Sequence, residues 1–240
     1  MEYFFRHQPD TFVFPMYSML HLLILGIAAL GVWLIIVNRQ ALRASNKLRI
    51  SLAIGLIVVQ LALYAWFASG DAALRAAGLP LYHCRVAEIA MVVALLSRHR
   101  FAKTIALYLG SYGSFFALLI PIMEAYHFPH VTNIAYFAAH LLMIWTVTYL
   151  LFVERYQFER ASLQHMLIFL NLLNIVIVLV NPLLNMNYAY FAHSPIFTNS
   201  FQSLPRDAYL ALLFLVYNLL ILMIYCCGKT LSTKSHTTPK

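Results

Sequence analysis

The stretch LPLYHCRVAEIA, at residues 79–90, places a histidine, a thiol, an arginine and a carboxylate within six positions: His83, Cys84, Arg85 and Glu88. A cysteine attacks as its thiolate, which a neighbouring imidazolium or guanidinium stabilises. These residue types therefore indicate nucleophilic chemistry centred on Cys84. On a helix, Cys84 and Glu88 share one face because they are four residues apart, and Arg85 is predicted to form an ion pair with Glu88.

The same residues also have a purely structural interpretation. His83 and Arg85 can extend to the outer headgroups, and Cys84 can be a small packing residue. A second candidate, His140, lies in the stretch NIAYFAAHLLMIW, about nine residues and ~13 Å of rise into its apolar run, near the expected membrane midplane. A lone buried imidazole is a common general base, although it can equally hydrogen-bond across a helix interface.

Further polar residues lie in or just beyond the apolar runs. Asn171 and Asn174, with Asn181 seven residues beyond the second, mark one stripe of a predicted helix. Interhelical hydrogen bonding is the favoured interpretation of these amides, with substrate binding as the alternative. In the loop that follows, Asn187 and Tyr188 are candidates for orienting a headgroup or for donating to an oxyanion.

The elements that carry these residues are predicted to be membrane helices. Hydrophobic residues make up 62% of the chain and charged residues 10%, against roughly half and a quarter in a soluble domain. Apolar runs near the ~20 residues that span a hydrocarbon core recur along the chain. They are Pro15–Val37, Ile50–Phe67, Leu79–Leu96, Thr104–Met123, Val131–Phe152, Leu163–Val180 and Tyr209–Tyr225. The sequence thus predicts an all-α, polytopic membrane bundle of about seven transmembrane helices.

The basic residues indicate how this bundle is oriented. The formal net charge is +8, and most of the Lys and Arg residues follow the first, third, fifth and seventh runs. These are Arg39, Arg43, Lys47, Arg49, Arg98, Arg100, Lys103, Arg155, Arg160, Lys229, Lys234 and Lys240. In a seven-span topology these connections share one side, which the positive-inside bias makes cytoplasmic. We therefore expect the N-terminus outside and the C-terminus in the cytoplasm, and no nucleic-acid partner, because the charge reflects orientation.

The domain organisation is simple. Residues 1–228 are predicted to form a single seven-helix transmembrane domain, and the polar residues 229–240 a disordered cytoplasmic tail. The long outer loop at residues 181–208 is aromatic, so it is expected to lie on the headgroup layer or to cap the bundle. Cys84 and the adjacent pair Cys226–Cys227 lack metal-ligand spacing, so no metal, cofactor or disulfide framework is predicted.

Three motifs in order give the chain a resemblance to a known family. They are LPLYHC (Leu79–Cys84), a proline-led run that carries a histidine (Pro129–His140), and NYAYFAHSP (Asn187–Pro195). With these motifs on a seven-span chain, the sequence resembles the YwaF-like bacterial membrane proteins and their vertebrate relative, transmembrane protein 164. That vertebrate member is an acyltransferase that moves fatty acyl chains between phospholipids with a cysteine and a histidine. The resemblance implies these two roles for Cys84 and His140.

The leading hypothesis is therefore an integral membrane lipid acyltransferase or transacylase. His140 would take the proton of Cys84, and the thiolate would attack the ester carbonyl of a phospholipid or glycolipid at the outer half of the membrane. The residues expected to bind substrate are His83, Arg85, Glu88, Asn171, Asn174, Asn187 and Tyr188. Membrane lipids are the expected partners and a bacterial plasma membrane the expected location, with the oligomeric state left open.

The alternative from another class is a non-enzymatic transporter or small-ligand channel. In that interpretation His140, Glu88 and Arg85 line a polar path through the bundle. The absence of a strong internal repeat and the scarcity of charged groups on the inner half of the runs count against it.

Overall fold

The structure is a computed structural model that describes residues 3–196, 198, 201 and 203–237. Regular elements in this part of the chain are all helical. The long helices are α1 (Met19–Val37), α3 (Lys47–Ala68), α5 (His83–Ser97), α6 (Arg100–Leu119), α7 (Val131–Thr148), α8 (Arg160–Leu184) and α10 (Arg206–Thr237). Short elements include α2 (Arg39–Arg43), α4 (Ala72–Ala77), the π-helical turn η1 (Tyr149–Val153) and the 3₁₀ turn η2 (Tyr188–Tyr190).

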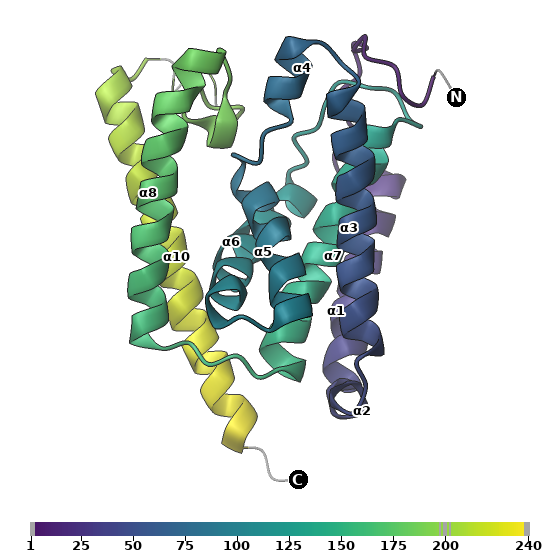
Figure 1. The fold of residues 1–240 in the computed structure, drawn as a ribbon, viewed down its shortest axis with the longest axis vertical. Helices are drawn as coiled ribbons and strands as arrows, with labels where there is room; N and C mark the ends of the chain where they lie inside the picture. The colour runs from purple at the N-terminus through teal and green to yellow at the C-terminus, as the bar shows by residue number, and fades with distance from the viewer. Residues whose placement is uncertain (1–2, 197, 199–200, 202, 238–240) are drawn as a thin grey trace.

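The hairpin of α5 and α6 lies at the centre of the bundle (Figure 1). On one side α3 and α7 pack against it, with α1 packed on α7, and on the other side α8 and α10 pack together. Much of α6 is buried, whereas most of α10 is exposed on the outer surface. The exposed positions of the outer helices are mainly apolar, as lipid-facing surfaces require.

Five helices within the described residues are long and apolar enough to cross a membrane. They are Met19–Val37, Lys47–Ala68, Val131–Val153, Arg160–Leu184 and Arg206–Ser232. This number supports a multi-pass membrane protein and agrees with five of the seven predicted spans. The central helix α5 has only 15 residues, which is about 22 Å of rise and shorter than a hydrocarbon core of ~30 Å.

Small side chains allow α5 and α6 to approach closely. Ala87 and Ala94 on α5 are fully buried, as is Ala106 on α6. One turn beyond Ala106, an added Cβ at Gly110 would lie 2.2 Å from the Cε atom of Met91, so only glycine fits the present packing. Close contact between small residues is a common way for helices to associate in membranes.

The start of α5 differs from the prediction of a helix from Leu79. The helix begins at His83, and Tyr82 before it has an extended backbone. Pro80 explains the shift, because proline lacks an N–H group and disfavours helical geometry in the residue before it. Figure 1 shows the chain passing from α4 into the interior of the bundle before α5 begins. The first residues of α5 therefore lie inside the protein.

The connection that contains α2, the α5–α6 connection and the α7–α8 connection lie at one end of the bundle (Figure 1), and their sequences are rich in basic residues. Several connect neighbouring helix ends through charged hydrogen bonds. These contacts join Arg43 to the carbonyl oxygens of Phe152 and Val153, Lys103 to Glu154, and Arg100 to Glu159. The connections predicted to share one side of the membrane thus lie at one end of the molecule.

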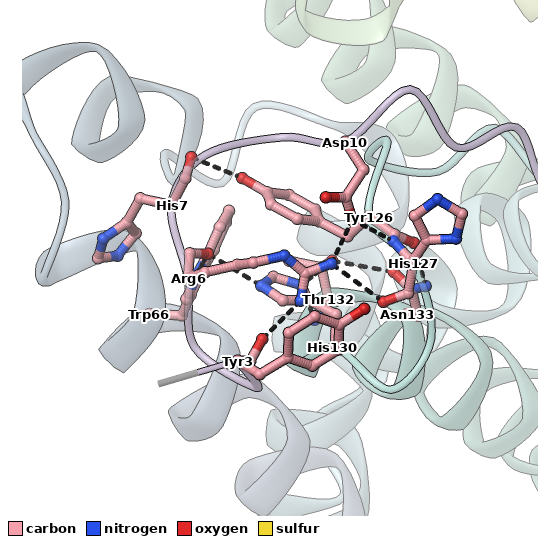
Figure 2. A network of polar contacts seen from close by, with 10 residues as sticks. All are labelled: Tyr3, Arg6, His7, Asp10, Trp66, Tyr126, His127, His130, Thr132 and Asn133. Atoms are coloured by element: carbon pink, nitrogen blue, oxygen red, sulfur yellow. Dashed lines mark hydrogen bonds and ion pairs between the residues drawn. The ribbon is translucent and has the colours of Figure 1, made fainter. Parts of the chain in front are cut away.

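At the opposite end, residues 3–10 fold over the ends of α3 and α7 (Figure 2). Arg6 forms an ion pair with Asp10. The Arg6 carbonyl oxygen accepts hydrogen bonds from Trp66 Nε1 at 3.2 Å and from His130 Nε2 at 3.0 Å. The N-terminal segment is therefore attached to both helices through its own backbone as well as its side chains.

The loop after α8 folds back over the start of α5. Asn181 accepts from the backbone N–H of Tyr188 at 2.8 Å and donates to its carbonyl oxygen at 3.1 Å. Tyr188 and Phe191 are fully buried in a cluster that includes Leu81 and Tyr82. Of the two arrangements expected for this loop, its described part adopts the one that caps the bundle.

The last helix continues further than expected. α10 runs through Gly228 to Thr237, within residues 229–240 that were predicted to be disordered, and residues 238–240 of that tail lie outside the described residues. A Cβ at Gly228 would lie 2.5 Å from the Phe158 ring, so the helix is closely packed at this point. Extending an existing helix also needs no new nucleus, which favours its continuation.

Candidate functional site

Cys84 lies in the first turn of α5. The residue before the helix, Tyr82, makes no capping hydrogen bond with its side chain. Free N–H groups and the helix dipole favour negative charge at a helix N-terminus. Burial of the thiol and the nearby Glu88 carboxylate disfavour the thiolate and outweigh this effect. Attack by this sulfur would therefore require a base to take its proton.

The surroundings of Cys84 bring four helices and the outer loop together. An added Cβ at Gly113 would lie 3.6 Å from Cys84 Cβ and 3.8 Å from Met143 Cε, so α6 presents bare backbone between α5 and α7 here. The thiol acts electrostatically on the phenol groups of six tyrosines: Tyr64, Tyr82, Tyr112, Tyr136, Tyr190 and Tyr217. They come from six separate segments, so the sequence pattern does not group them.

His140 is buried on α7, with 5% of its surface exposed. Its Nδ1 atom lies 2.7 Å from the carbonyl oxygen of Tyr136, one turn earlier. A carbonyl oxygen only accepts, so Nδ1 carries the proton. In the neutral imidazole Nε2 is then the unprotonated nitrogen, and it makes no hydrogen bond to any described residue.

Cys84 and His140 lie on neighbouring helices without a direct hydrogen bond between them in the described part of the chain. A Cβ added at Gly113 on α6 would lie 3.6 Å from Cys84 Cβ and 3.8 Å from Met143 Cε. Met143 follows His140 by three residues and therefore shares its helix face. At this level α6 thus lies against both α5 and α7.

His83 does not reach the headgroup level that the sequence analysis proposed. It is buried, and its Nε2 atom lies 2.8 Å from Oδ1 of Asn174 on α8. The ring edges of Tyr217 and Tyr112 meet it at centroid distances of 4.6 and 6.0 Å. The prediction was wrong because the chain enters the bundle before α5 begins. The Nδ2 atom of Asn174 has no hydrogen-bond partner.

The predicted ion pair between Arg85 and Glu88 is also absent among the described residues. Arg85 donates to the carbonyl oxygens of Ala77 at 2.7 Å and Leu79 at 3.2 Å, and it stacks over the Phe67 ring. Helical side chains point toward the helix N-terminus, which directs this guanidinium away from Glu88. Glu88 is 3% exposed, and its Oε2 atom has no partner.

The remaining predicted substrate residues are occupied by contacts within the protein. Asn171 exchanges two hydrogen bonds with Asn218 on α10, at 2.9 and 3.0 Å. Asn187 accepts from two backbone N–H groups of its own loop and donates to a carbonyl there. The Tyr188 hydroxyl donates to the carbonyl oxygen of Ala76. These contacts connect helices and shape the outer loop.

Two polar residues of α3 were not among the predicted site residues. Both side-chain polar atoms of Gln60 and the hydroxyl of Tyr64 are buried without partners among the described residues. The signal was available, since Gln60 is an uncharged polar residue in an otherwise apolar run. Groups of three or more His, Cys, Asp or Glu that could hold a metal ion are absent from the described residues.

Comparison with known proteins gives one result that bears on the site. The model of the TMEM164 family matches residues 11–227, which include α5, α7 and the loop after α8. The searches of curated proteins and of solved structures found no match. The match extends over most of the chain, and with it over both Cys84 and His140. This multi-pass membrane protein belongs to the TMEM164 family.

Proposed function

We propose that the protein is a membrane-embedded lipid acyltransferase or transacylase, with Cys84 as nucleophile and His140 as general base. It would move fatty acyl chains between phospholipids or glycolipids at the outer half of a cell membrane. In this proposal α5 and α6 complete seven crossings, with the N-terminus outside and the C-terminus in the cytoplasm. The basic end of the bundle supports this orientation through the positive-inside bias.

The observation that carries the proposal is the position of Cys84 in the uncapped first turn of α5. The first backbone N–H groups of this helix have no partner within it. These N–H groups are suited to stabilise the oxyanion of a tetrahedral intermediate, once the sulfur has bonded to carbon.

The tautomer of His140 supports its role as base. Because Nδ1 donates to the Tyr136 carbonyl, the lone pair of Nε2 is free to accept the thiol proton. A positioned base of this kind accelerates proton transfer by typically 10²- to 10⁴-fold. Fixing the ring by a backbone hydrogen bond also removes the alternative tautomer, in which Nε2 would be a donor.

The reaction would proceed in two half-reactions. First, the Cys84 sulfur bonds to the carbonyl carbon of an ester, the ester C–O bond breaks, and the lysolipid leaves with the proton held by His140. Second, an acceptor hydroxyl attacks the acyl-thioester, the C–S bond breaks, and Cys84 regains its proton. A donor from the bilayer is favoured over a soluble thioester, because the chain carries no glycine-rich phosphate-binding motif.

The test is transfer of a labelled acyl chain between lipids by the purified protein. Wild type is expected to transfer, and both Cys84→Ala and His140→Ala are expected to lose transfer while keeping their fold. Full activity in both variants, or none in wild type with phospholipid and glycolipid donors, would refute the proposal.

The transporter alternative has less support. A polar path that passes Glu88 would have to continue through the bundle toward its basic end. Beyond Glu88 the interior is apolar and filled: Met91, Ala94, Leu95, Leu107 and Leu150 are all buried there in one hydrophobic cluster. Flux of a small solute in proteoliposomes, lost in Glu88→Gln and unchanged in Cys84→Ala, would favour this alternative.

A further inference from the structure

Glu88, one helical turn from Cys84, and two residues of α3 carry buried polar atoms. The Oε2 atom of Glu88, both amide atoms of Gln60 and the hydroxyl of Tyr64 make no hydrogen bond within the described part of the chain. Glu88 is 3% and Gln60 9% exposed. In folded proteins the large majority of buried polar atoms are paired, so each exception requires an explanation.

Gln60 and Tyr64 belong to α3 and Glu88 to α5, and these two helices pack together in opposite directions (Figure 1). Cys84 and Glu88 both act electrostatically on the Tyr64 phenol. Gln60 lies one turn from Tyr64 on the same face of α3, as Glu88 lies one turn from Cys84 on α5. Since the helices are antiparallel, Gln60 and Glu88 form the layer directly below Tyr64 and Cys84. We call Gln60, Tyr64 and Glu88 the α3/α5 polar site.

Arg85 does not neutralise this site by direct contact, because it donates to the carbonyl oxygens of Ala77 and Leu79. Apolar residues at these three positions would avoid unpaired polar atoms in the core. Their presence therefore points to a ligand that supplies the missing partners.

The chemistry of the three side chains defines that ligand. A carboxylate accepts, whereas an amide and a phenol both donate and accept. A phosphate would be repelled by Glu88, and an acyl chain would leave all three unpaired. A hydroxyl group fits, since it donates one hydrogen bond and accepts others.

From this placement we infer that the α3/α5 polar site binds the hydroxyl group of the acyl acceptor, a lysolipid, and that Glu88 takes its proton. This inference rests on the proposed function and assigns its second half-reaction. The acceptor oxygen bonds to the thioester carbon, the C–S bond to Cys84 breaks, and the proton passes from the hydroxyl through Glu88 to the sulfur. No other reactant is needed.

The experiment separates the two half-reactions. Purified protein in detergent receives a phospholipid with a labelled acyl chain, and the label on Cys84 is measured before and after a lysophospholipid is added. In Glu88→Gln, which keeps the shape of the side chain, the thioester is expected to form at the wild-type rate. Its transfer to the lysolipid is expected to slow by on the order of 10²-fold.

Three further variants sharpen this test. Gln60→Leu and Tyr64→Phe are expected to leave thioester formation unchanged and to raise the half-saturating lysolipid concentration roughly tenfold, as loss of a hydrogen bond predicts. Asp207→Asn is the matched control, because it removes an exposed carboxylate outside the site. It is expected to transfer like wild type.

Four results would each overturn the inference while leaving the proposed function intact. The first is transfer at the wild-type rate in Glu88→Gln, and the second is an unchanged lysolipid dependence in both α3 variants. The third is an equal loss of both half-reactions in Glu88→Gln. The fourth is release of free fatty acid at the wild-type transfer rate without lysolipid, which would identify water as the acceptor. Failure of the proposed function is distinct, since wild type itself would then form no thioester.

Discussion

The Nδ1 atom of His140 donates a hydrogen bond to the carbonyl oxygen of Tyr136 at 2.7 Å. This contact lies within one turn of α7 and decides which ring nitrogen can act as a base. Because Nδ1 holds the proton, Nε2 is the acceptor. This hydrogen bond gives His140 the tautomer that the proposed role as base requires.

The first prediction concerns this imidazole. His140→Ala is expected to slow formation of the acyl-thioester by roughly 10²- to 10³-fold, because the thiol loses its base. The apparent affinity for the donor lipid should change little, and single-turnover kinetics separates the two quantities. His165→Ala on α8 is the control and should behave like wild type. A variant that lost affinity and kept its chemical rate would instead make His140 a binding residue.

Gly113 provides a test of packing beside the thiol. Gly113→Ala adds a methyl group at ordinary contact distance, 3.6 Å from Cys84 Cβ, so transfer should stay within about twofold of wild type. Gly113→Leu is expected to displace α5, because the added Cβ already lies 3.7 Å from Cys84 Cα. Loss of transfer and a lower midpoint of thermal unfolding should follow. In Gly26→Leu nothing lies within 4 Å of the added Cβ, so an equal effect there would contradict this explanation.

Asn181 is predicted to hold the outer loop in place. Asn181→Ala leaves the backbone N–H of Tyr188 unpaired in a buried cluster, while its carbonyl oxygen keeps the hydrogen bond from the Phe191 N–H. The unpaired N–H costs about 1–3 kcal/mol. Hydrogen exchange should therefore accelerate in residues 186–192, with a lower midpoint of thermal unfolding. Asn38→Ala, which removes an exposed amide, serves as the control. Unchanged protection of the loop would show that the aromatic packing suffices.

The N-terminal segment should loosen on acidification. Burial lowers the pKa of His130 below its ordinary 6.5. Its charged form is therefore disfavoured in the fold, and stability present above pH 6.5 is lost as the pH falls toward the lowered value. The hydrogen bonds from Arg6 and from the His127 backbone N–H lower the pKa of Asp10 below its ordinary 3.8. The stability that this carboxylate contributes above pH 3.8 is therefore lost as the pH falls through the lowered pKa.

Hydrogen exchange of residues 3–10 between pH 7.5 and pH 5 measures the loss of stability caused by protonation of His130. Arg6, Asp10 and His7 are the charged and titratable groups that act on His130. His130→Asn keeps a capping side chain at the start of α7 but removes the titration. The pH dependence should therefore flatten in this variant. The same dependence in both proteins would assign it to another group.

The sequence predicted the helices well because apolar runs and their lengths directly reflect a bilayer. It misplaced the start of α5, although Pro80 was a visible signal. Because the helix was predicted to start too early, His83 was predicted to lie at the surface. In the structure His83 is buried and hydrogen-bonded to Asn174. Local sequence patterns predict where along the chain a helix forms. How deep in the bundle its first residue lies depends on the path of the preceding segment.

The polar interior was harder to predict. Spacing alone suggested that Arg85 pairs with Glu88, because nothing in the sequence shows that the carbonyl oxygens of Ala77 and Leu79 lie nearer. Gln60 and Glu88 come from helices separated by α4 and two connections. How residues of two such helices are placed relative to each other depends on tertiary packing, which single-sequence patterns do not report.

The most direct measurement is intact-protein mass spectrometry after incubation with a phospholipid donor. Cys226→Ala/Cys227→Ala is the background, because it removes the two exposed thiols and leaves Cys84. The expected result is one added acyl chain on Cys84, released by neutral hydroxylamine and absent from the same background carrying Cys84→Ser. An unmodified Cys84 under conditions in which the protein transfers acyl chains would contradict its assignment as the nucleophile.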